Sequence, residues 1–251
     1  MSARRTLPFG ATAFAAAALL ATAVSGTQAA ELNNLNALSQ SDFRLLAEDL
    51  GAALSYKALV PAETLGVIGF DIGVGGTGTT LKHRDVAAKA AGGSTIPATV
   101  PVTTLRAVKG LPFNIDIGAA VGTVPSTGLK VAGGELRWAI LPGSALTPAI
   151  ALRGALTRVS GNDQLKLDTR SVDLSISKGF LMVTPYAGIG VVQTDAQLKN
   201  TSAALAKDKE SFTQQKVFVG ANLNLGLVNL AVEGDKTGDA TSYGVKFGFR
   251  F

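Results

Sequence analysis

Apolar and polar side chains alternate along this chain with a period of two residues, and this alternation limits the possible folds. In TSYGVKFGFRF (241–251) the odd positions are aromatic or aliphatic apart from Thr241, and the even positions are glycine, serine or basic. Successive side chains of a β-strand point to opposite faces, so this pattern is typical of a strand with one apolar face. The sequence predicts such a strand at 241–251.

The same alternation recurs along most of the chain. It is clear in VIGFDIGVG, FNIDIGAAVGT and KVFVGANLNL, where Phe218 breaks the rule, and weaker at 128–140, 146–160, 164–178, 183–198 and 226–235. A poor copy lies near 102–109, and turn sequences such as PSTG, SGND and DKTGD separate the segments. We therefore predict an all-β fold of about ten antiparallel strands, with eight or twelve as alternatives. No long helices alternate with the strands, as a βαβ fold would require.

The first residues follow the pattern of a secretory signal peptide. Arg4 and Arg5 precede the apolar run ATAFAAAALLATAV, which is too short to span a membrane as a helix, and small residues precede Ala30. We expect residues 1–29 to be a leader that is removed. Without the two arginines of the leader, the rest of the chain contains 21 Lys and Arg residues and 18 Asp and Glu residues. This balance gives no reason to expect a nucleic-acid partner.

Composition excludes several kinds of site. The chain has no cysteine and a single histidine, His83, so it has no disulfide, no thiolate metal site and no multi-histidine metal site. We expect no metal and no cofactor. Charged residues make up 16% of the chain, against about 25% in ordinary soluble domains, and the mean hydropathy is +0.30.

Period two alone does not separate a soluble barrel or sandwich from a membrane barrel. Three features favour the membrane: glycines lie on the polar face, where a narrow lumen crowds side chains; the chain is exported and lacks cysteine; and its last residue is Phe251. We therefore predict a single antiparallel transmembrane β-barrel over 65–251.

The last strand resembles the insertion signal of Gram-negative outer-membrane β-barrel proteins, in Tyr243, Phe247, Phe249 and Phe251. The stretch LSYKALVPAETLGVIGFDIG is also similar to the start of a set of uncharacterised proteobacterial barrels. The resemblance implies an outer-membrane location, outer-membrane lipid as surroundings and the barrel assembly machinery as a partner during biogenesis. It implies no activity, and it leaves the oligomeric state open.

Residues 30–64 precede the predicted barrel. SQSDFRLLAEDLGAAL predicts a short amphipathic helix with Ser41 as N-cap and Gly51 as its end, and LSYKALVP is strand-like. This segment could be a plug inside the barrel, a periplasmic cap or an extra strand. If both termini lie in the periplasm, successive turns alternate between the periplasmic side and the outside. The segments 81–101, 199–212 and 235–240 then lie outside and the short turns lie on the periplasmic side, as in known membrane barrels.

Two motifs invite a catalytic interpretation. GVGGTG fits G-x-G-x-x-G at Gly73, Gly75 and Gly78, but barely two helical turns and no apolar parallel strand follow it, so a glycine-rich strand end is the better interpretation. His83 with Asp85 suggests acid–base chemistry only weakly, because no G-x-S-x-G and no second histidine accompany them. We predict that the protein is not an enzyme.

The phase of each strand predicts which charged residues face the lumen. Six of each sign are expected there, so an internal salt-bridge network is favoured over the one-sign ring of a selective pore. The predicted lumen charges are Asp71, Arg106, Asp116, Glu135, Arg137, Arg153, Asp173, Lys216, Glu233, Asp235, Lys246 and Arg250. The aromatic residues predicted to form thin interfacial girdles are Phe113, Trp138, Phe180, Tyr186 and Phe249.

Two functions follow as hypotheses. The first is passive transport, through a narrow channel for small solutes or a pathway for hydrophobic compounds controlled by the N-terminal segment. The alternative is a closed structural or interaction barrel that presents the loops at 81–101 and 199–212. An open lumen would distinguish the first from the second.

Overall fold

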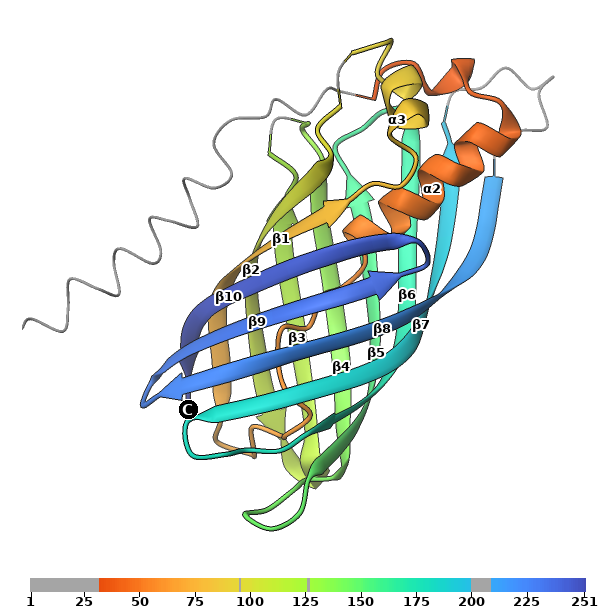
Figure 1. The fold of residues 1–251 in the computed structure, drawn as a ribbon. Coiled ribbons are helices and arrows are strands. Elements are labelled where there is room, and N and C mark those ends of the chain that lie inside the picture. The colour runs from red at the N-terminus through yellow and green to blue at the C-terminus, as the bar shows by residue number, and fades with distance from the viewer. Residues whose placement is uncertain (1–31, 95, 126, 200–208) are drawn as a thin grey trace, which may run out of the picture.

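The computed structural model describes residues 32–94, 96–125, 127–199 and 209–251. The predicted leader, residues 1–29, lies outside the described residues. In the described part of the chain, ten antiparallel strands form a closed barrel in which each strand pairs with its neighbour in sequence and β1 pairs with β10 (Figure 1). The predicted all-β barrel of about ten strands with an N-terminal helix is therefore confirmed.

The strands and helices have the following bounds. The strands are β1 (Phe70–Thr80), β2 (Thr99–Leu111), β3 (Ile115–Thr123), β4 (Lys130–Leu141), β5 (Ala149–Ser160), β6 (Leu165–Ser177), β7 (Val183–Leu198), β8 (Lys209–Leu225), β9 (Val228–Thr237) and β10 (Ala240–Arg250). The helices are η1 (Leu35–Ala37), α2 (Gln40–Leu54), α3 (Arg84–Ala90) and η2 (Pro112–Asn114).

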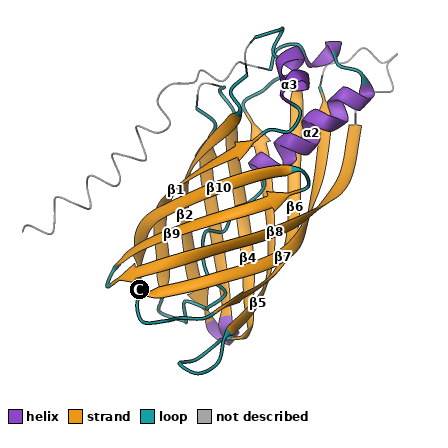
Figure 2. Ribbon diagram, in the orientation of Figure 1, coloured by secondary structure: helices purple, strands orange, loops and turns teal. Residues whose placement is uncertain are grey.

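The two ends of the barrel differ. One end, called the inner end here, holds the C-terminus and the connections 112–114, 142–148, 178–182 and 226–227. The other, called the outer end, holds α2, α3 and the longer connection 81–98 (Figure 2). Most of the loop predicted at 199–212 lies outside the described residues, and β8 already begins at Lys209. Membrane barrels combine short turns on the periplasmic side with longer loops on the outside, so the inner end matches the predicted periplasmic side.

Apolar side chains cover the outside of the barrel. Leu156, Ile189 and Val219 are 61%, 61% and 64% exposed, while their strand neighbours on the opposite face point into the lumen. A continuous apolar surface of this kind is unfavourable in water, and closure leaves no strand edge unpaired, as lipid requires. The outward face is therefore the face of a membrane-spanning barrel.

Helix α2 differs from its prediction at both ends. Its N-cap is Ser39, whose hydroxyl accepts a hydrogen bond from the backbone N–H of Asp42, and not Ser41. The helix also continues past Gly51 to Leu54. A Cβ at position 51 would overlap the side chain of Thr194 on β7, so this glycine allows close packing on the wall and does not end the helix.

The outer half of the lumen contains an apolar core. Phe43, Leu46 and Leu50 of α2 are almost fully buried against lumen-facing side chains of the strands, including Leu167 and Phe212. Helix α3 contributes to the same core through Val86, Ala87 and Ala90. The barrel is thus closed at this end by its own N-terminal helix.

Several boundaries differ from the sequence prediction. The strand-like LSYKALVP forms no strand and runs as an irregular segment inside the barrel. The loop predicted at 81–101 contains α3 and is shortened by β2, which begins at Thr99. The outer turn predicted at 235–240 is shorter as well, because β9 continues to Thr237.

Candidate functional site

The lumen holds a stretch of chain that is not part of the wall. Residues 55–65, called the lumen segment here, connect the end of α2 at the outer end to the start of β1 at the inner end and run through the barrel (Figure 1). Residues 52–62 are all buried. Every wall strand finds its hydrogen-bond partners in its two neighbouring strands, so the segment adds nothing to the closure of the sheet.

Arginines of the wall donate to main-chain carbonyls of the lumen segment. Arg106 Nη1 lies 2.7 Å from the carbonyl oxygen of Lys57, and Arg137 Nη1 lies 2.6 Å from that of Pro61. Both arginine side chains are buried. An irregular segment lacks internal hydrogen bonds, so these donors satisfy carbonyls that would otherwise be unpaired.

Wall acceptors complete the attachment near the inner end. Asp116 Oδ1 accepts hydrogen bonds from the backbone N–H of Leu65 and the hydroxyl of Thr64, both at 3.1 Å. Ser177 Oγ accepts from the backbone N–H of Ala62 at 3.1 Å. Donors and acceptors of the wall therefore hold the segment along its length.

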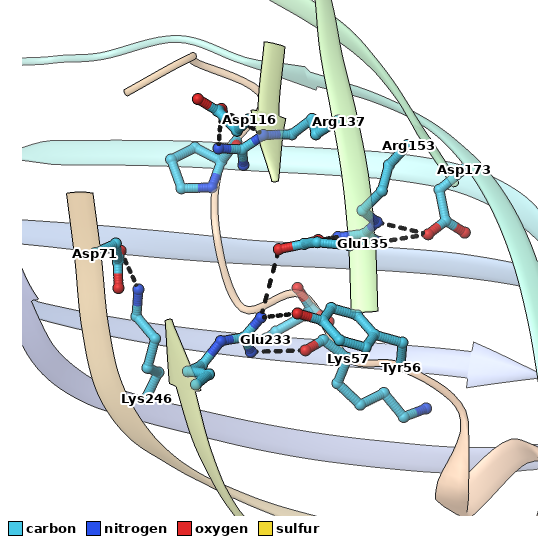
Figure 3. Close-up of polar contacts among 12 residues, drawn as sticks. Tyr56, Lys57, Asp71, Asp116, Glu135, Arg137, Arg153, Asp173, Glu233 and Lys246 are labelled. Atoms are coloured by element: carbon cyan, nitrogen blue, oxygen red, sulfur yellow. Dashed lines mark hydrogen bonds and ion pairs between the residues drawn. The ribbon is translucent and has the colours of Figure 1, made fainter. Parts of the chain in front are cut away.

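Ion pairs link the lumen face of neighbouring strands (Figure 3). Arg137 donates from Nε and Nη2 to the same oxygen of Asp116, at 3.1 and 2.6 Å, and Arg153 pairs in the same way with Asp173. Glu135 lies between Arg106 and Arg153, with distances of 3.9 and 3.8 Å. These groups are buried, where ionised side chains are stable only when paired.

Two lysines of the wall and one of the lumen segment complete the network. Lys246 lies 2.5 Å from Asp71, and Lys216 lies 3.7 Å from Asp173. Lys57 of the segment lies 2.8 Å from Asp235. The segment thus supplies a cation to a wall carboxylate as well as accepting hydrogen bonds from wall cations.

Lumen-facing glycines provide room for the segment. A Cβ on Gly244 would lie 2.8 Å from Leu59 Cδ2, and a Cβ on Gly75 would lie 3.3 Å from Leu59 Cδ1. A Cβ on Gly133 would lie 3.0 Å from the ring of Tyr56. Real Cβ atoms rarely approach so closely, so the glycine-rich polar face is shaped to fit the lumen segment.

Two aromatic residues in the lumen were missed or misplaced by the sequence prediction. Tyr186, predicted as a girdle residue, is 3% exposed and donates a hydrogen bond from its hydroxyl to Glu233 at 3.0 Å. Phe218 also faces the lumen. In the pairing of β7 with β8, Tyr186 lies opposite Gly220 and Phe218 lies opposite Gly188. Because Tyr186 shares a strand face with Gly188 and Gly190, the glycine pattern was the signal that could have placed it.

The structure places every predicted lumen charge on the lumen side. All are buried except Arg250, which is intermediate in exposure near the inner end. Of the predicted insertion-signal residues, Tyr243, Phe249 and Phe251 are exposed and Phe247 is half-buried. The girdle candidates Phe113, Trp138 and Phe180 are also exposed. The charges form the candidate site together with Tyr56 and Lys57, to which the sequence analysis gave no role, and with Tyr186, which it assigned to a girdle.

The two catalytic motifs form no active-site geometry. Gly73, Gly75 and Gly78 lie within β1 and precede no phosphate-binding helix. His83 Nδ1 lies 3.5 Å from Asp49 of α2, whereas the predicted partner was Asp85. Among the residues described, no cluster of three His, Cys, Asp or Glu side chains could hold a metal ion.

Asp49 joins α2 to the start of α3. Its Oδ2 accepts a hydrogen bond from the backbone N–H of His83 at 2.7 Å. Burial raises the pKa of the Asp49 carboxyl, and the hydrogen bonds from the backbone of His83 and Lys82 act in the opposite direction. The contact fixes the N-terminal helix to the connection between β1 and β2.

Little free space remains around the segment. A cavity of about 30 Å³ lies beside Leu54–Leu59 and is lined by wall residues such as Thr104 and Gly133. A single water needs roughly 10–15 Å³ of such volume, so this cavity holds no solute. No helix in the described ranges is long and apolar enough to cross a membrane.

Comparisons with known proteins give structural matches only. No protein-family model matches the chain, and no curated protein does. Among solved structures, the KdgM porin in complex with disordered oligogalacturonate is 12% identical, with a TM-score of 0.38, over 72% of this chain and 99% of that one. The outer membrane protein OprG from Pseudomonas aeruginosa is 13% identical, with a TM-score of 0.35, over 76% and 99% of the two chains.

A third match is Ail, the attachment invasion locus protein of Yersinia pestis, at 13% identity and a TM-score of 0.32 over 73% of this chain and 98% of that one. These structures belong to the class of outer-membrane β-barrels that the last strand was predicted to resemble. The similarity concerns the fold and extends to no function.

Proposed function

We propose that the protein is a closed outer-membrane β-barrel that presents a fixed surface of α2, α3 and the adjoining loops to the cell exterior. The observation that carries this proposal is the lumen segment, held by wall side chains from Tyr56 to Leu65, together with the apolar core around α2. The inner end is assigned to the periplasm, and assembly by the barrel assembly machinery follows from the resemblance of the last strand.

The size of the apolar core decides between a closed barrel and one that opens spontaneously. Burying a large apolar side chain contributes about 1.5–3 kcal/mol, so exposing Phe43, Leu46, Leu50 and Leu54 would cost roughly 6–12 kcal/mol. A free energy of about 1.4 kcal/mol corresponds to a factor of ten in population. Release of α2 as an intact helix, with no gain in its conformational entropy, would therefore leave roughly one barrel in ten thousand, or fewer, open.

Single-channel conductance of the refolded chain without residues 1–29 tests the proposal. Folding is established first by heat-modifiable migration in a detergent gel. We expect no conductance steps from the folded barrel. A variant that also lacks residues 30–65 is the positive control, and if it folds it should conduct because the lumen segment is gone. Steady steps from the chain that retains the segment would contradict a closed barrel.

Passive transport is the second candidate, and one observation favours it. The lumen segment contributes no strand to the sheet, and its removal would leave a lumen lined by charged side chains of both signs. Transport would then need a partner or ligand that binds the displaced segment with enough free energy to offset the exposed apolar core. Conductance that appears only on addition of such a partner would support this candidate.

A further inference from the structure

The outward face of β6 changes abruptly from apolar to charged. From the inner end, its outward residues are Ile176, Leu174 and Val172, and then Arg170, Asp168 and Lys166. On β7 the change comes at the matching position, because Gln193 lies opposite Arg170. On β5 it comes one outward residue later, because Leu156 lies opposite Arg170 and Arg158 lies opposite Asp168. This change marks the edge of the lipid-facing band toward the outer end.

Four cations lie just beyond this edge on three adjacent strands. This set, called the outer basic patch here, consists of Lys130 of β4, Arg158 of β5, and Lys166 and Arg170 of β6. Arg158 lies opposite Ala132 and Asp168. Each of the other three cations is two residues along from one of those partners, so each lies at a diagonal backbone distance of about 7–8 Å from Arg158, on the same face.

Carboxylates neutralise the outer basic patch only in part. Asp168 lies 2.9 Å from Arg158 Nε and 3.9 Å from Lys166 Nζ. Asp195 lies opposite Asp168 and accepts a hydrogen bond from Ser211 at 2.7 Å. Four cations and these two carboxylates leave two positive charges in excess, before Lys209 on β8 is considered.

Two members of the patch have no partner among the described residues. Lys130 and Arg170 are exposed and make no hydrogen bond or ion pair within the described ranges. Beside Arg170 the surface over β6–β8 is hollowed into a groove of about 340 Å³, lined by polar side chains that include Lys166, Gln193 and Lys209. The patch therefore combines free cationic donors with room for a bound group.

Outward lysines at the inner end are engaged differently. Lys109 donates to the carbonyl oxygens of Val67 and Gly69, and Lys178 donates to carbonyls of the 142–148 connection. These lysines stabilise turns, whereas Lys130 and Arg170 have no partner in the described part of the chain. The unpaired positive charge is thus specific to the outer edge of the lipid-facing band.

We propose that the outer basic patch binds the phosphate groups of phosphorylated lipid headgroups in the outer leaflet. Basic side chains beside an apolar membrane-facing surface attract anionic headgroups, and arginine matches phosphate oxygens with paired donors. Arg170 and Lys130 are the principal ligands, with Arg158 and Lys166 held in place by Asp168. The inference rests on the proposed outer-membrane location and not on whether the lumen is closed. The conductance experiment and the lipid-binding experiment can therefore fail independently of each other.

Retention of lipid by the folded barrel tests the proposal. The probe is diphosphorylated lipid A in nonionic detergent micelles, compared with the same lipid after removal of its phosphates, and bound lipid is counted by native mass spectrometry. We expect Arg170→Gln to weaken binding about five-fold and the double variant R158Q/R170Q about 25-fold, since each basic residue near an anionic lipid contributes about a factor of five.

Lys236→Gln is the matched control, because Lys236 is an exposed outward cation on β9 outside the patch. It should bind lipid as the wild type does. Equal loss of binding in K236Q and R170Q, or equal binding of the lipid without phosphates, would overturn the proposal. Complete displacement of the lipid by millimolar inorganic phosphate would show a site for free anions, and would overturn the assignment to a lipid.

Discussion

At the scale of single residues, buried charge is stabilised by partners from different strands. Arg137 illustrates this, because its guanidinium contacts both Asp116 of the neighbouring strand and the carbonyl of Pro61 in the lumen segment. The arginine therefore holds wall and segment together. Its contribution to the stability of the folded barrel depends on burial, since the same kind of ion pair at the surface contributes little stability.

Replacing Arg137 with methionine should destabilise the folded barrel by about 3–5 kcal/mol, because Asp116 would remain as an unpaired buried charge. The measurement is the urea midpoint of unfolding in micelles. Arg158→Met in lipid-free detergent is the control, and its midpoint should not change because Arg158 pairs with Asp168 at the exposed surface. Equal effects of the two substitutions would contradict the importance of burial.

Asp49 should make the stability depend on pH. Burial raises its pKa in the folded state, so its contribution to stability is fully present below the ordinary pKa of aspartate, about 3.9, and is lost as pH rises through the raised value. Asp49→Asn removes this titration. The variant should therefore gain stability relative to the wild type as the pH is raised from about 4 toward neutrality. A constant difference between their urea midpoints would refute this account.

At the scale of elements, helix α2 and the lumen segment are attached by different forces. The helix is held by apolar side chains in the outer half of the lumen, and the segment by hydrogen bonds and by glycines that make room for Leu59 and Tyr56. Filling the space around Leu59 should therefore disturb the segment while leaving the strand pairing intact.

Gly244→Leu should loosen the lumen segment, because overpacking of this kind costs about 1–3 kcal/mol. The protein has no cysteine, so a single cysteine replacing the buried Ala58 can report the accessibility of the lumen segment. We expect maleimide to label this cysteine about ten-fold faster in the G244L background. Gly154→Leu is the matched control, since a Cβ there meets nothing within 4 Å. Equal labelling rates in the wild-type, G244L and G154L backgrounds would show that the packing of Leu59 does not hold the lumen segment in place.

At the scale of the whole molecule, the path of the N-terminal part defines a topology. Residues 32–39 lie at the outer end, where Leu35 and Asn34 bond to Gln164 and Ala90, while β1 begins at the inner end. The chain therefore passes through its own barrel before it forms the wall. This arrangement differs from the sequence expectation that both termini lie on the periplasmic side.

A cysteine replacing Asn36 should be labelled by a membrane-impermeant maleimide in intact cells, because Asn36 is exposed at the outer end. A cysteine replacing Met182 in an inner-end turn should be labelled only after the outer membrane is permeabilised. The reverse pattern would invert the assigned orientation. Labelling of neither site in intact cells, with both labelled afterwards, would contradict the placement of α2 and the inner-end turns at opposite ends of the barrel.

The strands of the barrel wall can be predicted from the amino-acid sequence alone. The period of two residues specifies which side chains share a face of a strand. Glycine and charged residues lie on one face and apolar residues on the other, and this pattern predicted ten strands and the lumen charges from Asp71 to Arg250. Strand alternation is a local property, so it can be seen in the sequence without knowledge of the partners.

The contents of the lumen, in contrast, depend on contacts between residues that are far apart in the sequence. Which charges pair depends on register, as for Arg153 opposite Asp173, and a period of two leaves register open. The lumen segment has no regular hydrogen bonds, and its conformation is set by wall residues such as Arg106 and Gly244 that are remote in sequence. Closure of the lumen is therefore a long-range outcome, which local patterns do not contain.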